Sequence, residues 1–119
     1  MKKTNIFNQI KKWVEDRGLL NISWDKSAQA SFLAEELSEF LRAKEDNEEI
    51  DALCDIIIFA TNAISLKGYD PNIALEETLK EINSRTGAFN KQTGKWEKFK
   101  TPEAMALWYS ANYDKEKYK

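Results

Sequence analysis

The chain of 119 residues contains no histidine and a single cysteine, Cys54. Without histidine, it can build neither Ser–His nor Cys–His catalysis nor a histidine-ligated zinc site. One cysteine excludes an intrachain disulfide and a cysteine cluster. Because Cys54 lies in an apolar stretch, the sequence predicts a buried structural thiol rather than a nucleophile.

Long hydrophobic runs and excess positive charge are also missing. No apolar stretch follows the opening lysines, and the run Ile56–Ala60 is too short to span a bilayer. We therefore expect a cytoplasmic location and no membrane partner. The formal net charge of −2 argues against a nucleic acid polymer as partner. The length suits one domain, residues 1–119, with some hydrophobic surface left for a partner subunit.

Basic residues are absent between Lys44 and Lys67, where six acids lie. Two of these, Asp51 and Asp55, begin an otherwise apolar helical run. A helix turns by ~100° per residue, so these two acids and Asn62 fall on one narrow strip. The strip has apolar flanks, and we expect most sides of this helix to be enclosed. Aligned acids in such surroundings need a cation or a hydrogen-bond donor.

Apolar spacing and capping residues predict an all-α fold, a bundle of about four or five helices with short connections. The expected helices cover residues 5–18, 27–44, 46–67 and 70–84, and a short helix follows residue 101. The predicted N-terminal caps are Asn5, Ser27, Asp70 and Thr101, and Gly18 and Gly68 are the predicted stops. A small hairpin could form near residues 88–99. The tail from about Tyr113 is expected to be mobile.

A second acidic pair, Glu36 and Glu39, lies one helical turn apart on the preceding predicted helix. A short turn makes the two helices antiparallel neighbours, so both pairs should face one spot. Such an oxygen-lined cage suits Mg²⁺ or Mn²⁺ rather than zinc. Acid pairs are also common on solvated helix faces. A solvated face does not explain why Asp55 precedes Ile-Ile-Ile-Phe without a lysine within one turn.

At these residues the chain resembles the all-α nucleoside triphosphate pyrophosphohydrolases typified by MazG. The family signature is ExxE on one helix and ExxD on the next. Glu36 and Glu39 match the first element, and Asp55 matches the aspartate of the second. Ala52 stands where the family pattern has Glu, and Asp51 is the natural substitute. Small phage-type MazG-like proteins look similar, with a DAxxD version and C-terminal segments like Glu81-Ile-Asn-Ser-Arg-Thr-Gly87 and Pro102-Glu-Ala-Met-Ala-Leu-Trp-Tyr109.

The resemblance implies that Glu36, Glu39, Asp51 and Asp55 bind Mg²⁺, with Mn²⁺ as an alternative ion. It also implies hydrolysis of a nucleoside triphosphate to a nucleoside monophosphate and pyrophosphate by a homodimer or homotetramer. In this interpretation Glu35, Glu36, Glu39 and Asp55 are catalytic, and Glu35 could orient the attacking water.

Substrate contacts are predicted after the acidic segment. Lys80, Asn83 and Arg85 could meet phosphate oxygens, although lysine and arginine are also ordinary residues at a helix C-terminus. Trp24 and Phe59 could stack on a base.

Two other functions stay open at this point. Phosphoribosyl-ATP pyrophosphatase uses similar chemistry, but the phage-like C-terminal segment counts against it. A non-catalytic helical interaction protein with the same fold is the other alternative, and Ala52 keeps it open. Metal dependence separates the classes.

Overall fold

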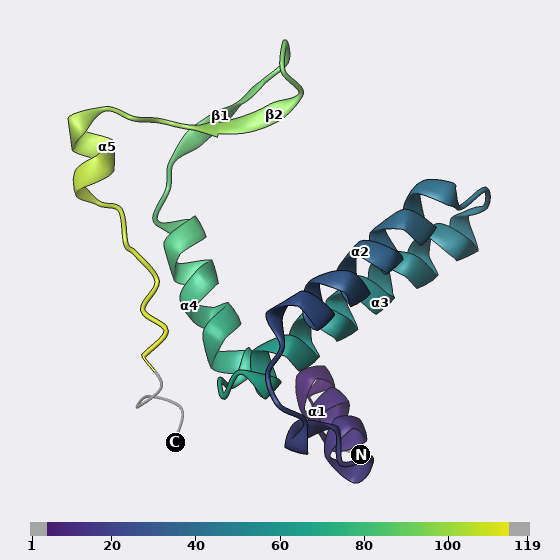
Figure 1. Cartoon of the computed structure of the whole chain (residues 1–119). Coiled ribbons are helices and arrows are strands. Elements are labelled where there is room, and N and C mark those ends of the chain that lie inside the picture. Colours follow the sequence, from purple (N-terminus) through teal and green to yellow (C-terminus); the bar gives the residue numbers. More distant parts are fainter. Residues whose placement is uncertain (1–4, 115–119) are drawn as a thin grey trace, which may run out of the picture. The chain divides into compact units, whose positions relative to one another are not determined.

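The computed structural model describes residues 5–114, which are mostly helical, with five α-helices and one two-stranded hairpin in that range (Figure 1). The predicted all-α class and the small hairpin are therefore confirmed. Contacts divide the chain into two compact units, Met1–Pro71 and Asn72–Lys119, and each is described by itself. The prediction of one domain stays a prediction. Of the tail expected to be mobile, residues 115–119 lie outside the described residues.

The first unit opens with helix α1, Ile6–Asp16. The side chain of Asn5 accepts a hydrogen bond of 2.8 Å from the backbone nitrogen of Phe7, so the predicted cap is confirmed. The chain leaves the helix through Gly18, whose φ of 68° suits glycine better than other residues. A single 3₁₀ turn, Leu19–Asn21, follows.

Helices α2, Lys26–Arg42, and α3, Asp46–Leu66, pack along each other as an antiparallel pair (Figure 1). The prediction that Ser27 caps α2 is wrong. Asp25 is the cap, and its carboxylate accepts a hydrogen bond of 3.3 Å from the backbone nitrogen of Ala28. Aspartate and serine are equally good caps, so the sequence alone did not separate the two positions.

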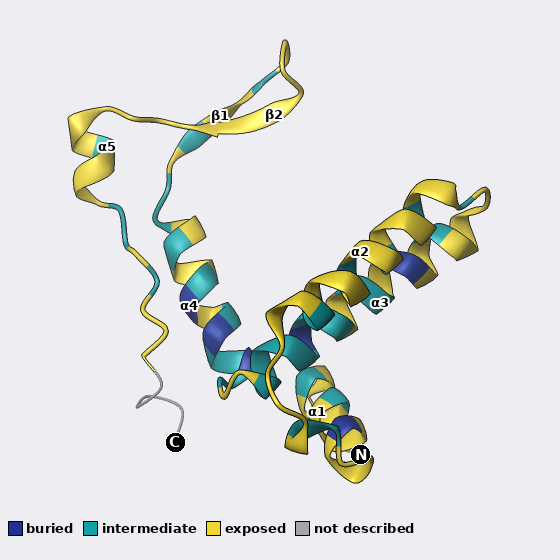
Figure 2. Ribbon diagram, viewed as in Figure 1, coloured by how far each residue is buried: buried dark blue, intermediate teal, exposed yellow. Residues whose placement is uncertain are grey.

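The inner face of the pair differs from the expected one (Figure 2). Ala52 is 2 % exposed, and Asp55 and Phe59 are half-buried, so α3 packs through the side that carries the acids. Apolar spacing predicts an inner face on α2 made of Ala30, Leu33, Leu37, Phe40 and Leu41, and an apolar side of α3 opposite the acids made of Ile50, Leu53, Ile57, Ala60 and Ile64. Of these residues, Leu33, Phe40, Ala60 and Ile64 are half-buried, whereas Ala30, Leu37, Leu41, Ile50, Leu53 and Ile57 are exposed. Cys54 is exposed too, which corrects the predicted buried thiol. A helix that is apolar on most sides does not reveal its inner face by periodicity.

The second unit contains helix α4, Pro71–Asn83, strands β1, Gly87–Asn90, and β2, Lys95–Lys98, and helix α5, Pro102–Ala106. Phe89 pairs with Trp96 across the antiparallel hairpin. Only glycine fits at position 87, because a Cβ atom there would lie 2.2 Å from the carbonyl oxygen of Glu97. Thr101 caps α5 as predicted. Across residues 5–114, no helix combines the length and apolar character that a membrane crossing requires.

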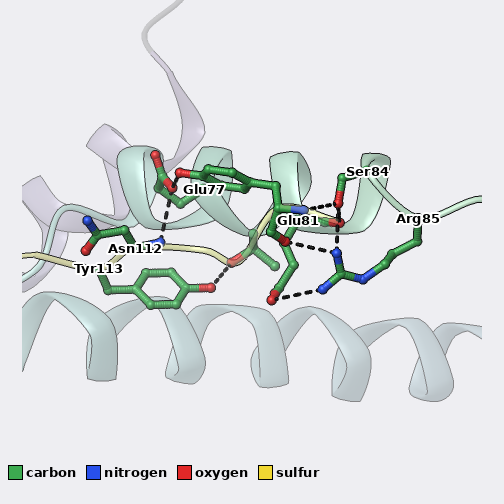
Figure 3. Close-up of polar contacts among 8 residues, drawn as sticks. Glu77, Glu81, Ser84, Arg85, Asn112 and Tyr113 are labelled. Carbon is green, nitrogen blue, oxygen red and sulfur yellow. Dashed lines mark hydrogen bonds and ion pairs between the residues drawn. The ribbon is translucent and has the colours of Figure 1, made fainter. Parts of the chain in front are cut away.

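A polar network joins the segment after α5 to helix α4 (Figure 3). Glu77 is 5 % exposed, and its carboxylate accepts hydrogen bonds from the hydroxyl of Tyr109 and the backbone nitrogen of Asn112. Farther along, Arg85 donates to the backbone carbonyl of Tyr109 at 3.0 Å and to the hydroxyl of Ser84 at 2.8 Å. The three bonds that involve Tyr109 and Asn112 connect residues 24 to 35 positions apart within the second unit.

We expect Tyr109→Phe to lower the free energy of unfolding by about 1–3 kcal/mol, because it removes a donor from a buried carboxylate. Tyr113→Phe is the matched control. Tyr113 also uses its hydroxyl, on Thr78 at 2.7 Å, but it is 41 % exposed and water can replace the lost bond. Urea unfolding measures both effects, and equal losses would contradict this account.

Candidate metal site

Four of the predicted acids lie on the packed helices of the first unit. Glu36 and Glu39 belong to α2, and Asp51 and Asp55 belong to α3. Glu36 and Asp55 are half-buried, whereas the other two are exposed. The Oε2 atom of Glu36 is buried and has no hydrogen-bond partner among the described residues. A buried acceptor without a partner is unfavourable, so Glu36 can accept a cation or a donor.

Electrostatic effects link these carboxylates. Burial raises the pKa of Glu36 from 4.5 to about 7, with further contributions from a hydrogen bond with Glu39 and from the charges of Glu39, Asp55 and Glu35. Burial also raises the pKa of Asp55, and the charges of Asp51 and Glu39 add to it. Helices α2 and α3 therefore bring acids from both predicted pairs within electrostatic reach of one another.

The carboxylates are neighbours rather than a closed set of ligands. Within residues 5–114, no three acidic, cysteine or histidine side chains are already arranged to hold a metal ion. None of the four acids forms an ion pair with a lysine or arginine in the same range. Drawing like charges closer together requires a cation between them.

Arg42 was overlooked by the sequence analysis. It lines a shallow hollow of about 360 Å³ together with Glu39, Glu48 and Asp51. Its Nε donates to the backbone carbonyl of Ser38 at 3.2 Å, four residues earlier on α2. The i, i+3 spacing between Glu39 and Arg42 was the signal that could have found it. Arg42 therefore lies near the two exposed acids, Glu39 and Asp51. The half-buried acids, Glu36 and Asp55, have no cation within ion-pair distance in the part of the chain that the structure describes.

The neighbouring residues Asp51 and Ala52 differ in how far their side chains are buried. Ala52 is 2 % exposed, whereas Asp51 is exposed and still acts electrostatically on Asp55. Asp51 reaches the acidic group from the solvent side of α3.

The three predicted phosphate contacts belong to the second unit, and their binding role stays a prediction. Lys80 pairs with Glu77 at 3.5 Å, and Asn83 is exposed. The guanidinium of Arg85 also lies 3.5 Å from the carboxylate of Glu81 and 4.4 Å from the ring centroid of Trp108. Together with its hydrogen bonds, these contacts give Arg85 a structural function in the second unit.

The two predicted base contacts lie in the first unit, in different surroundings. The ammonium of Lys67 lies 4.7 Å from the ring centroid of Trp24. Phe59 stacks on Phe32, with 5.5 Å between ring centroids. Phe59 lines the same cavity as Asp55, a space of about 490 Å³. Only Phe59 of the two is therefore placed beside a predicted metal ligand.

No protein-family model, curated protein or solved structure matches this chain. The candidate site is therefore argued from its own geometry and charges.

The raised pKa of Glu36 predicts how the metal-free protein responds to pH. Between its ordinary value of 4.5 and about 7, the folded state binds more protons than the unfolded state. This contribution to stability is fully present below pH 4.5 and is lost as the pH rises through 7. In EDTA, we expect the Tm of the wild type to fall between pH 5 and 8, and Glu36→Gln to reduce that fall.

Glu76→Gln is the control, because Glu76 is an exposed acid on α4. It should leave the slope of Tm against pH unchanged. Identical slopes for the wild type and Glu36→Gln would show that Glu36 titrates as an ordinary surface acid.

Proposed function

We propose that this chain is a Mg²⁺-dependent nucleoside triphosphate pyrophosphohydrolase that releases a nucleoside monophosphate and pyrophosphate. The observation that carries the proposal is the electrostatic coupling of carboxylates across α2 and α3, with raised pKa values at Glu36 and Asp55. Further support comes from the resemblance of the two acidic motifs to those of the MazG-like enzymes. A cytoplasmic location belongs to the same proposal.

The donor set fits a hard divalent cation. Glu36, Glu39, Asp51 and Asp55 offer only carboxylate oxygens, which suit Mg²⁺ or Mn²⁺. The buried, unpartnered Oε2 of Glu36 is an acceptor of the kind such an ion would satisfy. Bound Mg²⁺ would neutralise the phosphate chain and make water a better nucleophile.

The chain's own residues would then position the reactants. Glu36, Glu39, Asp51 and Asp55 on α2 and α3 would hold the ion, and the ion would supply positive charge to bind and orient the triphosphate. Glu35 is exposed beside Glu36 on α2, and its proposed role is to orient the attacking water. Attack by this water on the α-phosphorus would form a new P–O bond and break the α–β anhydride, so the bridging oxygen would leave with pyrophosphate.

Exposed apolar side chains on α2 and α3 support a homodimer or homotetramer. Leu41 is 75 % exposed, and Ile50 and Ile57 are 59 % and 56 % exposed. Large apolar side chains gathered on one pair of helices are typical of association surfaces.

The same exposed side chains favour a second candidate, a non-catalytic helical interaction module. Such a module needs the apolar surface but not the coupled acids. Metal-dependent turnover distinguishes the enzyme from the module.

Asp55→Asn should abolish turnover, because it removes a ligand charge at nearly constant volume. In EDTA the same substitution should raise the Tm, since it relieves repulsion within the acidic group. Phosphorus NMR identifies the products and calorimetry gives the Tm, with Glu76→Gln as control. Retained turnover would exclude this metal site. Orthophosphate and a nucleoside diphosphate would show cleavage at the β–γ bond and contradict the proposed reaction.

We expect Asp51 to take the metal-binding role of the glutamate that the family pattern has at position 52, where this chain has Ala52. We expect Asp51→Ala to lower kcat/KM by about 100-fold or more, since even indirect supports of a metal contribute about 10- to 100-fold. Ala52→Glu alone should lower the Tm in EDTA, because it places a carboxylate at a buried position. The double variant should recover part of the activity in Mg²⁺. A fully active Asp51→Ala enzyme would show that three carboxylates suffice.

A further inference from the structure

The hairpin formed by β1 and β2 lies in the second unit and is largely exposed (Figure 2). Phe89 and Trp96 lie opposite each other on its two strands and are 61 % and 52 % exposed. An isolated two-stranded hairpin is at best marginally stable in water. Two large aromatic side chains left in water on such an element are typical of a surface that a partner covers.

The register gives the hairpin two faces of different character. Phe89 pairs with Trp96, and Gly87 pairs with Lys98. Because side chains alternate along a strand, these four residues share one face, which we call the aromatic face. It combines two exposed rings with a lysine.

The opposite face holds the acid of the hairpin. Ala88 pairs there with Glu97, and Asn90 pairs with Lys95. The side chain of Asn90 donates a hydrogen bond to the carboxylate of Glu97, which keeps both on that face. Glu97 is the one acid in the sequence of residues 86–100, so the aromatic face carries positive charge without an acid beside it.

Neighbouring residues hold the members of the aromatic face in place. A Cβ atom at Gly87 would lie 2.6 Å from the Cζ2 atom of Trp96, so the indole lies directly over this glycine. The ammonium of Lys98 lies 5.0 Å from the ring centroid of Trp108. Trp96 and Lys98 are two residues apart, which in a strand is about 7 Å. A base and a phosphate of one nucleic acid strand have a comparable separation.

The charge of the hairpin differs from that of the whole chain. Residues 86–100 contain four lysines and one acid, whereas the formal net charge of the chain is −2. Charges at a protein surface are screened over about 8 Å at physiological ionic strength, so the nearby lysines decide what the hairpin attracts. The surface therefore suits a partner that is anionic and presents flat rings.

We propose that the aromatic face binds single-stranded nucleic acid, with bases stacked on Trp96 and Phe89 and a phosphate at Lys98. This goes beyond the proposed function and revises the expectation, based on net charge, of no nucleic acid partner. Bases must leave a duplex to stack on side chains, so a single strand is preferred. Stacking accepts every base, and we expect little sequence preference. An acidic protein segment would use the lysine but leave both rings without a flat partner.

Fluorescence anisotropy of a labelled 12-nucleotide oligodeoxythymidine, titrated with the full chain, tests the proposal. EDTA in the buffer excludes binding through metal at the acidic group. We expect Trp96→Ala to weaken binding by about 5- to 150-fold, as for the loss of one stacked base. Trp96→Phe keeps a ring and should retain most of the affinity.

Phe99→Ala is the matched control for Trp96→Ala. Phe99 is 49 % exposed, close to Trp96, and its backbone nitrogen continues the pairing by donating to Thr86 at 2.8 Å. It lies three residues after Trp96, so alternation places it on the opposite face. We expect its affinity to stay within about twofold of the wild type, because a ring there cannot stack on the bound strand.

The lysines give a second, independent test of the face. Lys98→Gln should reduce the slope of log Kd against log salt concentration by about 0.7, the value for one phosphate of a single strand. Lys95→Gln removes the same charge from the opposite face and should leave that slope unchanged.

The wild type decides the proposal even if Trp96→Ala does not fold. Absence of binding to the oligonucleotide, equal binding to a duplex of the same length, or displacement by poly-glutamate at equal charge would each overturn it. Equal losses in Trp96→Ala and Phe99→Ala would overturn the assignment to the aromatic face. Dissociation of an oligomer in Trp96→Ala, with no oligonucleotide bound by the wild type, would show that a second copy covers this face instead.

Discussion

The packing of α2 against α3 is the constraint on which the candidate site depends. Ala52 on α3 is 2 % exposed, and a side chain of one methyl group leaves room for close packing there. This packing brings Glu36 and Asp55 out of water together. The raised pKa of each follows first from burial and then from neighbouring charges.

This packing also explains the exposed apolar surface of the first unit. Because α3 turns its acidic side toward α2, its many isoleucine and leucine side chains cannot all be inside. Ile50 and Ile57 remain more than half exposed, as does Leu41 on α2. Burying carboxylates lowers stability unless a cation offsets the repulsion. Association through the apolar surface would recover part of that stability. The half-buried acids and the exposed apolar residues therefore both follow from which side of α3 packs against α2.

The sequence predicted local features better than long-range ones. The all-α class, the hairpin and the caps at Asn5 and Thr101 depend on residues a few positions apart, and all were confirmed. The sequence did not reveal which side of α3 packs against α2, because apolar residues surround most of that helix and give no single stripe. The bond from Tyr109 to Glu77 spans 32 positions and leaves no periodic signal. Pairing of the acids could be predicted, whereas their burial depended on how two helices pack.

Helix α3 relates the candidate metal site to the cavity through its own repeat. Asp55, Phe59 and Asn62 are separated by four and three residues, so they form one row along the helix. A rigid helix fixes the spacing of such a row better than a loop can. The proposed ion at Asp55 and a base stacked on Phe59 would therefore lie along one face of α3, so this single helix would position both ends of a nucleotide.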